Sequence, residues 1–241
     1  MQIKEKPFFS IITVTYNSEK YLEQTIQSII NQGIINIEYI IIDGASTDGT
    51  LEIINKYSNF ISYWTSEKDH GIYDAINKGI SVSNGKYIGI INSDDWYEDG
   101  VFKNIQEILV KTEVDILSGL LRVWEDEFIL GVQGNTSKSL KYGMISHPTC
   151  FVNRNVYERL GLFDANYKIV GDYDFIMRCF KNNCTFHFME SIIANFRTSG
   201  ISNSDSNTRL SEFFKVQLAN KIISFPKYIL EKFKLRIKSL L

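Results

Sequence analysis

The sequence predicts an α/β fold with a mostly parallel central sheet flanked by helices, and three observations lead to this class. Short apolar, β-branched runs alternate with segments of helical periodicity through the first hundred residues. The runs are continuous rather than alternating, which is typical of parallel strands buried on both faces. Each run ends in a cluster of Asp, Asn, Ser or Thr. Such β-α-β alternation places helices on both faces of one sheet.

The first half follows this alternation closely. Strands are expected at residues 8–15, 37–42, 61–66 and 87–91. Helices are expected at residues 21–30, 50–57 and 73–83. In the first of these helices Leu22, Ile26 and Ile29 fall on one face, which is the stripe that a surface helix buries.

The second half is less regular. Helices are expected at residues 100–111, 154–160 and 172–181, and strands at 115–124, 128–132 and 191–196. No Pro- or Gly-rich linker interrupts the chain. We therefore expect one domain, residues 1–205, followed by a C-terminal helical extension, residues 206–241.

Composition excludes several function classes. The net charge of −2 does not indicate a nucleic-acid partner. The three cysteines, an odd number with no CxxC pair, argue against a disulfide framework and a zinc site and fit a reducing compartment. No signal-peptide pattern and no long apolar segment stands out, so we expect a cytoplasmic protein.

Three polar clusters follow predicted strands: residues 15–17 (TYN), Asp43, and the pair Asp94 and Asp95. In open α/β sheets, ligands bind outside the carboxyl ends of the strands. The clusters are therefore expected to converge on one edge of the sheet, although they lie far apart in the sequence.

Adjacent carboxylates at a strand end suit a hard divalent cation such as Mg²⁺ or Mn²⁺. The alternative for Asp94 and Asp95 is a solvated turn or a helix cap. Asp43 is placed to accept a hydrogen bond from a base N–H. Its alternative is a cap for the following helix, which Asp48 fits better.

Asp172 and Asp174 begin a predicted helix. An acid in the first turn interacts favourably with the helix dipole, so capping is one interpretation. The other is a general base that takes the proton from an attacking hydroxyl. Arg178, four residues after Asp174, is expected to pair with it. Of the three histidines, His147 is the best candidate to line a pocket.

The sequence lacks both a GxGxxG after the first strand and a GxxxxGK[ST] motif. A dinucleotide oxidoreductase and a P-loop enzyme are therefore disfavoured.

Several segments, taken in order, resemble the family 2 glycosyltransferases, whose GT-A fold is a Rossmann-like fold of nucleotide-diphospho-sugar transferases. They are 10–17 (SIITVTYN), 38–50 (EYIIIDGASTDGT), 71–80 (GIYDAINKGI), 85–95 (GKYIGIINSDD), 161–164 (GLFD) and 171–178 (GDYDFIMR). Each segment alone is a weak match, whereas the ordered set is specific.

The resemblance implies roles in binding the nucleotide. Thr15, Tyr16 and Asn17 are similar to the first-strand segment that contacts it, and Asp43 to the residue that reads the base. Asp94 resembles the family residue nearest the ribose. Lys78 resembles a residue that adds positive charge near the donor.

The resemblance also implies a metal site and a base. Asp94 and Asp95 resemble the family's Asp-x-Asp pair, with Asp95 on a Mn²⁺ or Mg²⁺ ion, and Asp172 matches the catalytic base. Two departures stand out. Gly171 replaces a Glu that many relatives carry, and Ser199 replaces the first Gly of a Gly-Gly-x-Ser segment.

The implied activity is inverting transfer of a hexosyl or N-acetylhexosaminyl group from a nucleotide-diphosphate donor, with a UDP-sugar favoured. The acceptor is a hydroxyl in glycan or polysaccharide synthesis, on a glycan or a lipid-linked molecule. A catalytically silent nucleotide- or sugar-binding module is the main alternative. A nucleotidyltransferase would need a Gly-rich basic loop after the first strand, which residues 16–19 (YNSE) do not provide.

The C-terminal residues 227–241 contain five basic residues and one acidic residue. Their apolar residues, among them Ile229, Leu230, Phe233 and Ile237, share one helical face. This is the composition of an interfacial helix on an anionic membrane, here the inner face of the plasma membrane. The alternatives are packing on the domain or on a second subunit of a homo-oligomer.

Overall fold

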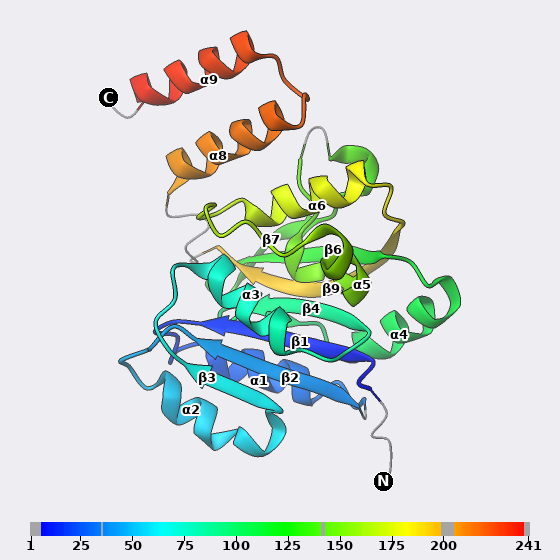
Figure 1. Ribbon diagram of the computed structural model, residues 1–241. Helices are drawn as coiled ribbons and strands as arrows, with labels where there is room; N and C mark the ends of the chain where they lie inside the picture. Colours follow the sequence, from blue (N-terminus) through cyan, green and yellow to red (C-terminus); the bar gives the residue numbers. More distant parts are fainter. Residues whose placement is uncertain (1–5, 35, 141–142, 199–204, 239–241) are drawn as a thin grey trace.

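The protein is described here by a computed structural model, which covers residues 6–34, 36–140, 143–198 and 205–238. These residues form a nine-stranded sheet in the order β3-β2-β1-β4-β8-β6-β9-β5, with β7 paired to β6 (Figure 1). The strands are β1 (Phe9–Thr15), β2 (Ile37–Asp43), β3 (Tyr63–Ser66), β4 (Tyr87–Asn92), β5 (Trp96–Tyr97), β6 (Ile116–Glu125), β7 (Phe128–Gln133), β8 (Phe151–Asn153) and β9 (Phe186–Arg197).

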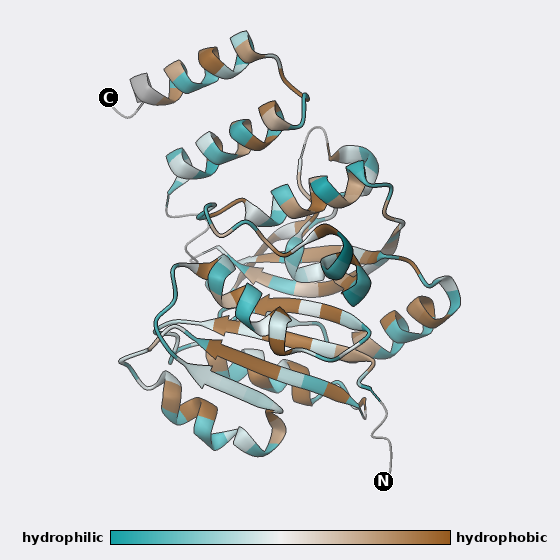
Figure 2. Cartoon of the chain, viewed as in Figure 1, coloured by the Kyte–Doolittle hydropathy of each residue, from teal (hydrophilic) through white to brown (hydrophobic). Residues whose placement is uncertain are grey.

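Helices cover both faces of the sheet. They are α1 (Leu22–Ile30), α2 (Thr50–Lys56), α3 (Ile72–Val82), α4 (Val101–Thr112), α5 (Arg154–Leu160), α6 (Gly171–Lys181), α8 (Ser206–Ala219) and α9 (Phe225–Lys238), with 3-10 turns η1 (Ser58–Phe60), η2 (Ser137–Ser139) and η3 (His147–Thr149). One core packs α1, α2 and α4 on the sheet, and the other packs α3, α5 and α6 on the opposite face. The apolar central strands in Figure 2 lie between these two layers.

Strands β1 to β4 form the parallel half of the sheet. Their register places Thr15 opposite Asp43, Val14 opposite Asn92, and Asp43 opposite Ser66. The four strands therefore end at nearly the same level. All seven residues of β1 are buried, as expected of a strand covered on both faces.

The second half of the sheet is mixed. Strand β8 runs antiparallel to both β4 and β6, and β6 runs parallel to β9. The predicted α/β class is confirmed, with β1 to β4 as the parallel part of the sheet. The short strand β5 was not predicted, and β9 is longer than the expected 191–196.

The C-terminal helices differ in how they pack. Helix α8 lies on α6, where the Phe213 ring stacks on Tyr173 at 4.8 Å and Val216 is fully buried. Helix α9 lies farther from the sheet (Figure 1) and exposes an apolar group, Phe225, Ile229, Leu230 and Phe233. Within the described ranges, no helix is both long and apolar enough to cross a membrane. The domain boundary at residue 205 stays a prediction.

Candidate active site

The carboxyl ends of β1, β2 and β4 bring three of the predicted clusters together. Thr15 lies opposite Asp43 in the register, and β4 ends on the other side of β1. The Ser18 and Ser93 hydroxyls, 2.7 Å apart, join the loop after β1 to the loop after β4. The structure therefore brings residues 15–17, Asp43 and the Asp94–Asp95 pair together on one edge of the sheet, as expected.

Asp95 is fully buried on this edge of the sheet. Its Oδ1 accepts a hydrogen bond from the Arg197 backbone N–H at 3.1 Å, whereas its Oδ2 has no partner among the described residues. Burial, and then the neighbouring charge of Asp94, raise the pKa of Asp95 well above its usual range. Burial also raises the pKa of Asp94.

These two carboxyl groups fit the implied cation. A buried carboxylate oxygen without a partner is costly, and a divalent cation would supply the missing interaction. The described residues contain no group of three His, Cys, Asp or Glu side chains arranged to hold a metal. Mg²⁺ is often held by one or two carboxylates, with substrate phosphates and waters as the other ligands. Asp94 and Asp95 match that pattern.

Arg197 is a site residue that the sequence predictions missed. Its guanidinium lies between the rings of Tyr21 and Trp96, at 4.4 and 4.3 Å from their centroids. It donates hydrogen bonds to the Asp94 carbonyl and to the Gln24 side chain. The stacking fixes a cation beside the acidic pair. Only its place at the end of a strand could have indicated this, and the predicted departure at Ser199 lies outside the described residues.

Asp43 is fully buried and its carboxyl group is already engaged. It accepts hydrogen bonds from the Ser46 N–H (2.9 Å), the Ser46 hydroxyl (2.5 Å) and the Ser66 hydroxyl (2.6 Å). Asp48, as expected, bonds to both the N–H and the hydroxyl of Thr50 at the start of α2. Asp43 thus holds the loop after β2, and its reading of the base stays a prediction.

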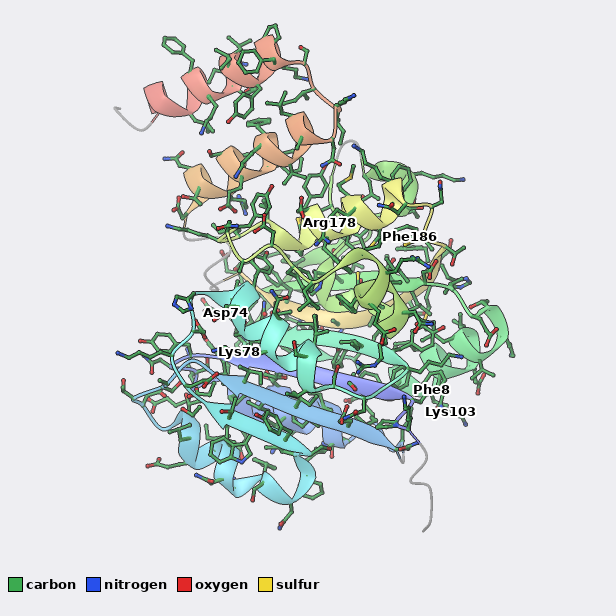
Figure 3. The ribbon with its side chains drawn as sticks, viewed as in Figure 1. Phe8, Asp74, Lys78, Lys103, Arg178 and Phe186 are labelled. Carbon is green, nitrogen blue, oxygen red and sulfur yellow. The ribbon has the colours of Figure 1, made fainter. Side chains whose placement is uncertain are left out.

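Lys78 lies on α3 with its charge already paired. Its ammonium is 2.9 Å from Glu67 and 3.6 Å from Asp74, one helical turn away (Figure 3). Hydrogen bonding to Glu67 raises the pKa of Lys78, so the side chain carries its charge at neutral pH. A contact with the donor stays a prediction for this residue.

Asp172 is the second residue of α6. Its Oδ1 accepts the Tyr173 N–H at 2.8 Å and lies 3.3 Å from the Tyr73 hydroxyl. That hydroxyl also donates to the Ile169 carbonyl at 2.7 Å, so its hydrogen is shared between the two acceptors. Burial raises the pKa of Asp172 to about 6, which is higher than usual for an aspartate. A carboxylate with that pKa suits a general base near neutral pH.

Asp174 has a different role on the same helix. Its carboxylate pairs with Arg178 at 3.1 Å, as predicted. Arg178 also donates to the carbonyls of Leu160 and Leu162 and so ties α6 to the end of α5 (Figure 3). The pair is structural, which leaves Asp172 as the candidate base.

The structure explains the glycine at position 171. A Cβ there would stand 2.8 Å from a carbon of the Tyr73 ring, so that ring occupies the space of a side chain. A larger residue such as the Glu of many relatives does not fit without moving Tyr73. The contact between Tyr73 and Asp172 joins residues 99 positions apart, so no local pattern could predict it.

His147, which was predicted to line a pocket, is connected to Asp172 through the rings of Phe163 and Tyr73. Its ring packs edge-on against Phe163 at 5.5 Å, and Phe163 stacks on Tyr73 at 5.7 Å. Burial lowers the pKa of His147 to about 4, so the imidazole is neutral at physiological pH. The three cysteines are free and buried, as expected of small core residues.

A parallel half-sheet that ends in paired carboxylates, with a partly buried acid at the start of α6, matches the α/β fold of GT-A type that the sequence predicts. The family model Glycosyl transferase family 2 matches residues 10–175, which is more than half of the chain. The protein therefore belongs to glycosyl transferase family 2.

Similar proteins carry related names. A PGL/p-HBAD biosynthesis glycosyltransferase of Mycobacterium bovis is 28% identical over 205 residues, covering 82% of this chain and 80% of its own length. An uncharacterized glycosyltransferase of Haemophilus influenzae is 27% identical over 228 residues, covering 83% of this chain and 70% of its own.

Solved structures share the fold. S. aureus TarS 1-349 in complex with UDP-GlcNAc has a TM-score of 0.73 and 19% identity, covering 94% of this chain and 71% of that one. A mannosyltransferase from Pyrobaculum calidifontis, in complex with GDP-Man and Mn²⁺, has a TM-score of 0.71 and 16% identity. The match covers 96% of this chain and 70% of that one. In the longer TarS structure the match spans 39% of that chain.

Proposed function

We propose that this family 2 transferase moves a sugar from a UDP-sugar to an acceptor hydroxyl, with inversion at the anomeric carbon. The observation that carries the proposal is the presence of two acids with different properties. Asp95 has a buried carboxylate oxygen without a partner among the described residues, and burial raises the pKa of Asp172 to about 6. The first suits a cation on a diphosphate and the second suits a base. A neighbour with bound UDP-GlcNAc supports the donor class.

In this mechanism Asp172 accepts the proton of the acceptor hydroxyl. The hydroxyl oxygen attacks the anomeric carbon from the side opposite the diphosphate, whose bond to that carbon breaks in the same step. A single displacement of this kind inverts the configuration. Tyr73 and the Tyr173 N–H orient the Asp172 carboxyl group through the hydrogen bonds described above.

The donor side stabilises the leaving group. Asp94 and Asp95 would hold a Mn²⁺ or Mg²⁺ ion, which when bound supplies positive charge against the departing diphosphate. Arg197, fixed between Tyr21 and Trp96, adds a permanent charge beside it. Preorganised charge of this kind is commonly the largest contribution to such catalysis.

We also propose where in the cell the enzyme acts. The acceptor is a glycan or a lipid-linked glycan, and the reaction takes place on the cytoplasmic side. The exposed apolar residues of α9 and its lysines would rest on the inner face of an anionic membrane. A homo-oligomer that covers the same residues is the alternative occupant of this surface.

The experiment that tests the function compares sugar transfer by the wild type and by Asp172→Asn, with Mn²⁺, a UDP-sugar and a soluble glycan acceptor. Loss of the base is expected to lower the transfer rate by about 10²–10⁴-fold while UDP binding is kept. Asp174→Asn is the matched control, because it lies on the same helix turn. UDP binding with no transfer by the wild type to any acceptor tried would favour the catalytically silent module.

A further inference from the structure

The start of α6, the helix that carries Asp172, has no capping side chain of its own. Val170 precedes the helix and Gly171 begins it, and neither has a side chain that can accept a hydrogen bond. The first N–H groups of a helix have no partner inside it, so they need acceptors from elsewhere. At this helix the acceptor comes from a distant part of the chain.

That acceptor is Glu212, in the middle of α8. One of its carboxylate oxygens accepts the Lys168 N–H at 2.8 Å, and the other accepts the N–H groups of Ile169 and Val170 at 3.0 and 3.2 Å. Three consecutive backbone donors thus converge on one carboxylate. The negative charge lies just before α6, where the helix dipole favours it. Glu212 therefore fixes residues 168–170 against α8.

The same loop holds the hydrogen-bond partner of Asp172. The Ile169 carbonyl accepts the Tyr73 hydroxyl at 2.7 Å, whereas Asp172 Oδ1 lies 3.3 Å from that hydroxyl. The shorter contact goes to the carbonyl, so the position of residue 169 decides how much of this hydrogen reaches Asp172. A carboxylate that receives less hydrogen bonding keeps a higher pKa and is a stronger base.

The charge of Glu212 acts on Asp172 as well. Burial raises the pKa of Asp172 most, and the Glu212 carboxylate adds to the effect in the same direction. The other titratable groups beside Asp172 are the Tyr73 hydroxyl on α3 and the Cys150 thiol after η3. Burial raises the pKa of both groups, so they are uncharged at neutral pH.

We infer that Glu212 is a positioning residue for sugar transfer: by binding three N–H groups before α6, it sets the place of Asp172 and of its partner Tyr73. This assignment rests on the proposed role of Asp172 as the base. Packing of α8 on α6, through the Phe213 ring on Tyr173, holds Glu212 in reach of the loop. Helix α8 then belongs to the transferase domain, whereas α9 takes no part in positioning the base.

The test compares the wild type with Glu212→Gln in the transfer assay described for Asp172→Asn. The amide group of Gln sets a donor against the loop N–H groups, so the loop is expected to move. Misplacement of a catalytic group by about 1 Å can cost about 100-fold, so we expect kcat to fall about 10–100-fold with UDP affinity unchanged. Glu158→Gln, an exposed position on α5, is the matched control and should change neither quantity.

The pH profile gives a readout that a merely structural role would not move. In Glu212→Gln its midpoint should shift to lower pH, because the negative charge is removed and the Tyr73 hydrogen is released to Asp172. Glu212→Asp keeps the charge, so it should lower kcat less and leave the midpoint close to that of the wild type. A fall in kcat without any shift of the midpoint would assign Glu212 to stability alone and overturn the inference.

Two further measurements separate positioning from folding. Hydrogen exchange of the Lys168, Ile169 and Val170 amides should be at least about tenfold faster in Glu212→Gln, while thermal unfolding shows that the fold is retained. In an Asp172→Asn background, Glu212→Gln should cause no further loss of transfer, because it acts through Asp172.

The outcomes distinguish the inference from the proposed function. Wild-type kcat and amide exchange in a folded Glu212→Gln, or a full second loss on top of that in Asp172→Asn, would overturn the inference and leave Asp172 as the base. Unchanged transfer in Asp172→Asn itself would overturn both.

Discussion

The site has two sides that are built differently: the donor side, at the ends of the parallel strands, and the base side, around the proposed catalytic base Asp172. The donor side uses the ends of three parallel strands, where Thr15, Asp43 and the acidic pair follow directly from the sequence alternation. The base side uses the start of α6, the α3 residue Tyr73 and the turn η3. Its geometry depends on contacts between distant segments. A shared sheet edge thus brings ligand-binding groups together predictably, whereas the base is tuned by packing.

The two sides also differ in electrostatics. Asp95 is buried, one of its oxygens has no partner among the described residues, and the acid Asp94 lies beside it. A cation bound there would stabilise the ionised form of both acids. Asp172 is partly buried and accepts hydrogen bonds from Tyr73 and a backbone N–H, and burial raises its pKa to about 6. These different surroundings suit the two acids to the different roles that we propose for them.

Asp95→Asn is expected to give the largest effect on the donor side. Removing the charge should lower Mn²⁺-dependent UDP affinity by at least about 100-fold, since altering even outer-shell partners of a metal costs about 10–100-fold. It should also raise the melting temperature of the metal-free protein, because a buried unpaired carboxylate is removed. Calorimetry and thermal unfolding measure the two effects. Asp99→Asn, on the following exposed loop, should change neither; unchanged Mn²⁺ dependence in Asp95→Asn would refute the metal site.

On the base side, Asp172→Asn is expected to stabilise the fold. The pKa of Asp172 is about 6 in the folded protein, above its ordinary value of 3.8, so its contribution to stability is present at low pH and lost as the pH rises through 6. The variant should raise the free energy of unfolding by about 1–3 kcal/mol at pH 8 and by less at pH 5. Urea unfolding at both pH values measures this. If Asp172→Asn instead lowered the free energy of unfolding equally at pH 5 and pH 8, burial would not be destabilising the ionised carboxylate of Asp172.

Wild-type transfer should depend on the same ionisation. Activity is expected to rise with pH through about 6, as Asp172 loses its proton and becomes able to accept one. The pH profile of kcat/KM for the acceptor measures this. A flat profile between pH 5 and 7, measured with saturating donor and metal, would point to a different base.

Tyr73→Phe should give a smaller effect, because the ring that fills the space beside Gly171 remains. Loss of one hydrogen bond is expected to lower kcat by about 3–10-fold, leave donor KM unchanged and move the midpoint of the pH profile upward. Tyr157→Phe is a matched control, since the buried Tyr157 hydroxyl has no partner within the described ranges. Equal loss of activity in both variants would mean that packing, rather than the contact with Asp172, is responsible.

The smallest expected effect concerns α9, outside both sides of the site. The full chain should sediment with vesicles rich in phosphatidylserine, less so as salt is raised, and a chain ending at residue 224 should stay in solution. Transfer to a water-soluble acceptor should be the same for both. Equal sedimentation of the two chains would assign the exposed apolar face to protein packing.

The parallel half could be predicted from the sequence because its information is local. Continuous apolar runs and the polar residues after them specify strands β1, β2 and β4 and the edge they share. The predicted bounds of each of these strands differ from the observed ones by one residue at one end. Pairings of higher sequence separation were not predictable: β5 consists of two residues, and its partner β9 lies almost a hundred residues farther along the chain.

Within the site, residue types were more predictable than contacts. Asp95 and Asp172 were singled out as candidates by their places after a strand and at a helix start together with the family resemblance, and their roles stay proposals. Arg197 and Tyr73 were not singled out, because an arginine at a strand end and a tyrosine on a helix are ordinary core or surface residues until their partners are known. For Asp43 the position indicated a ligand contact, which stays a prediction, and the three hydrogen bonds that hold its loop were not predicted.

We propose above all that the acidic edge of the sheet is a metal-dependent site for a nucleotide diphosphate. The most direct test is calorimetric titration of UDP into the wild-type protein with and without Mn²⁺. Saturable binding that requires the metal is the predicted result, because Asp94 and Asp95 repel the diphosphate in its absence. No binding at about 1 mM UDP with Mn²⁺ present, a limit that corresponds to about −4 kcal/mol, would contradict the account.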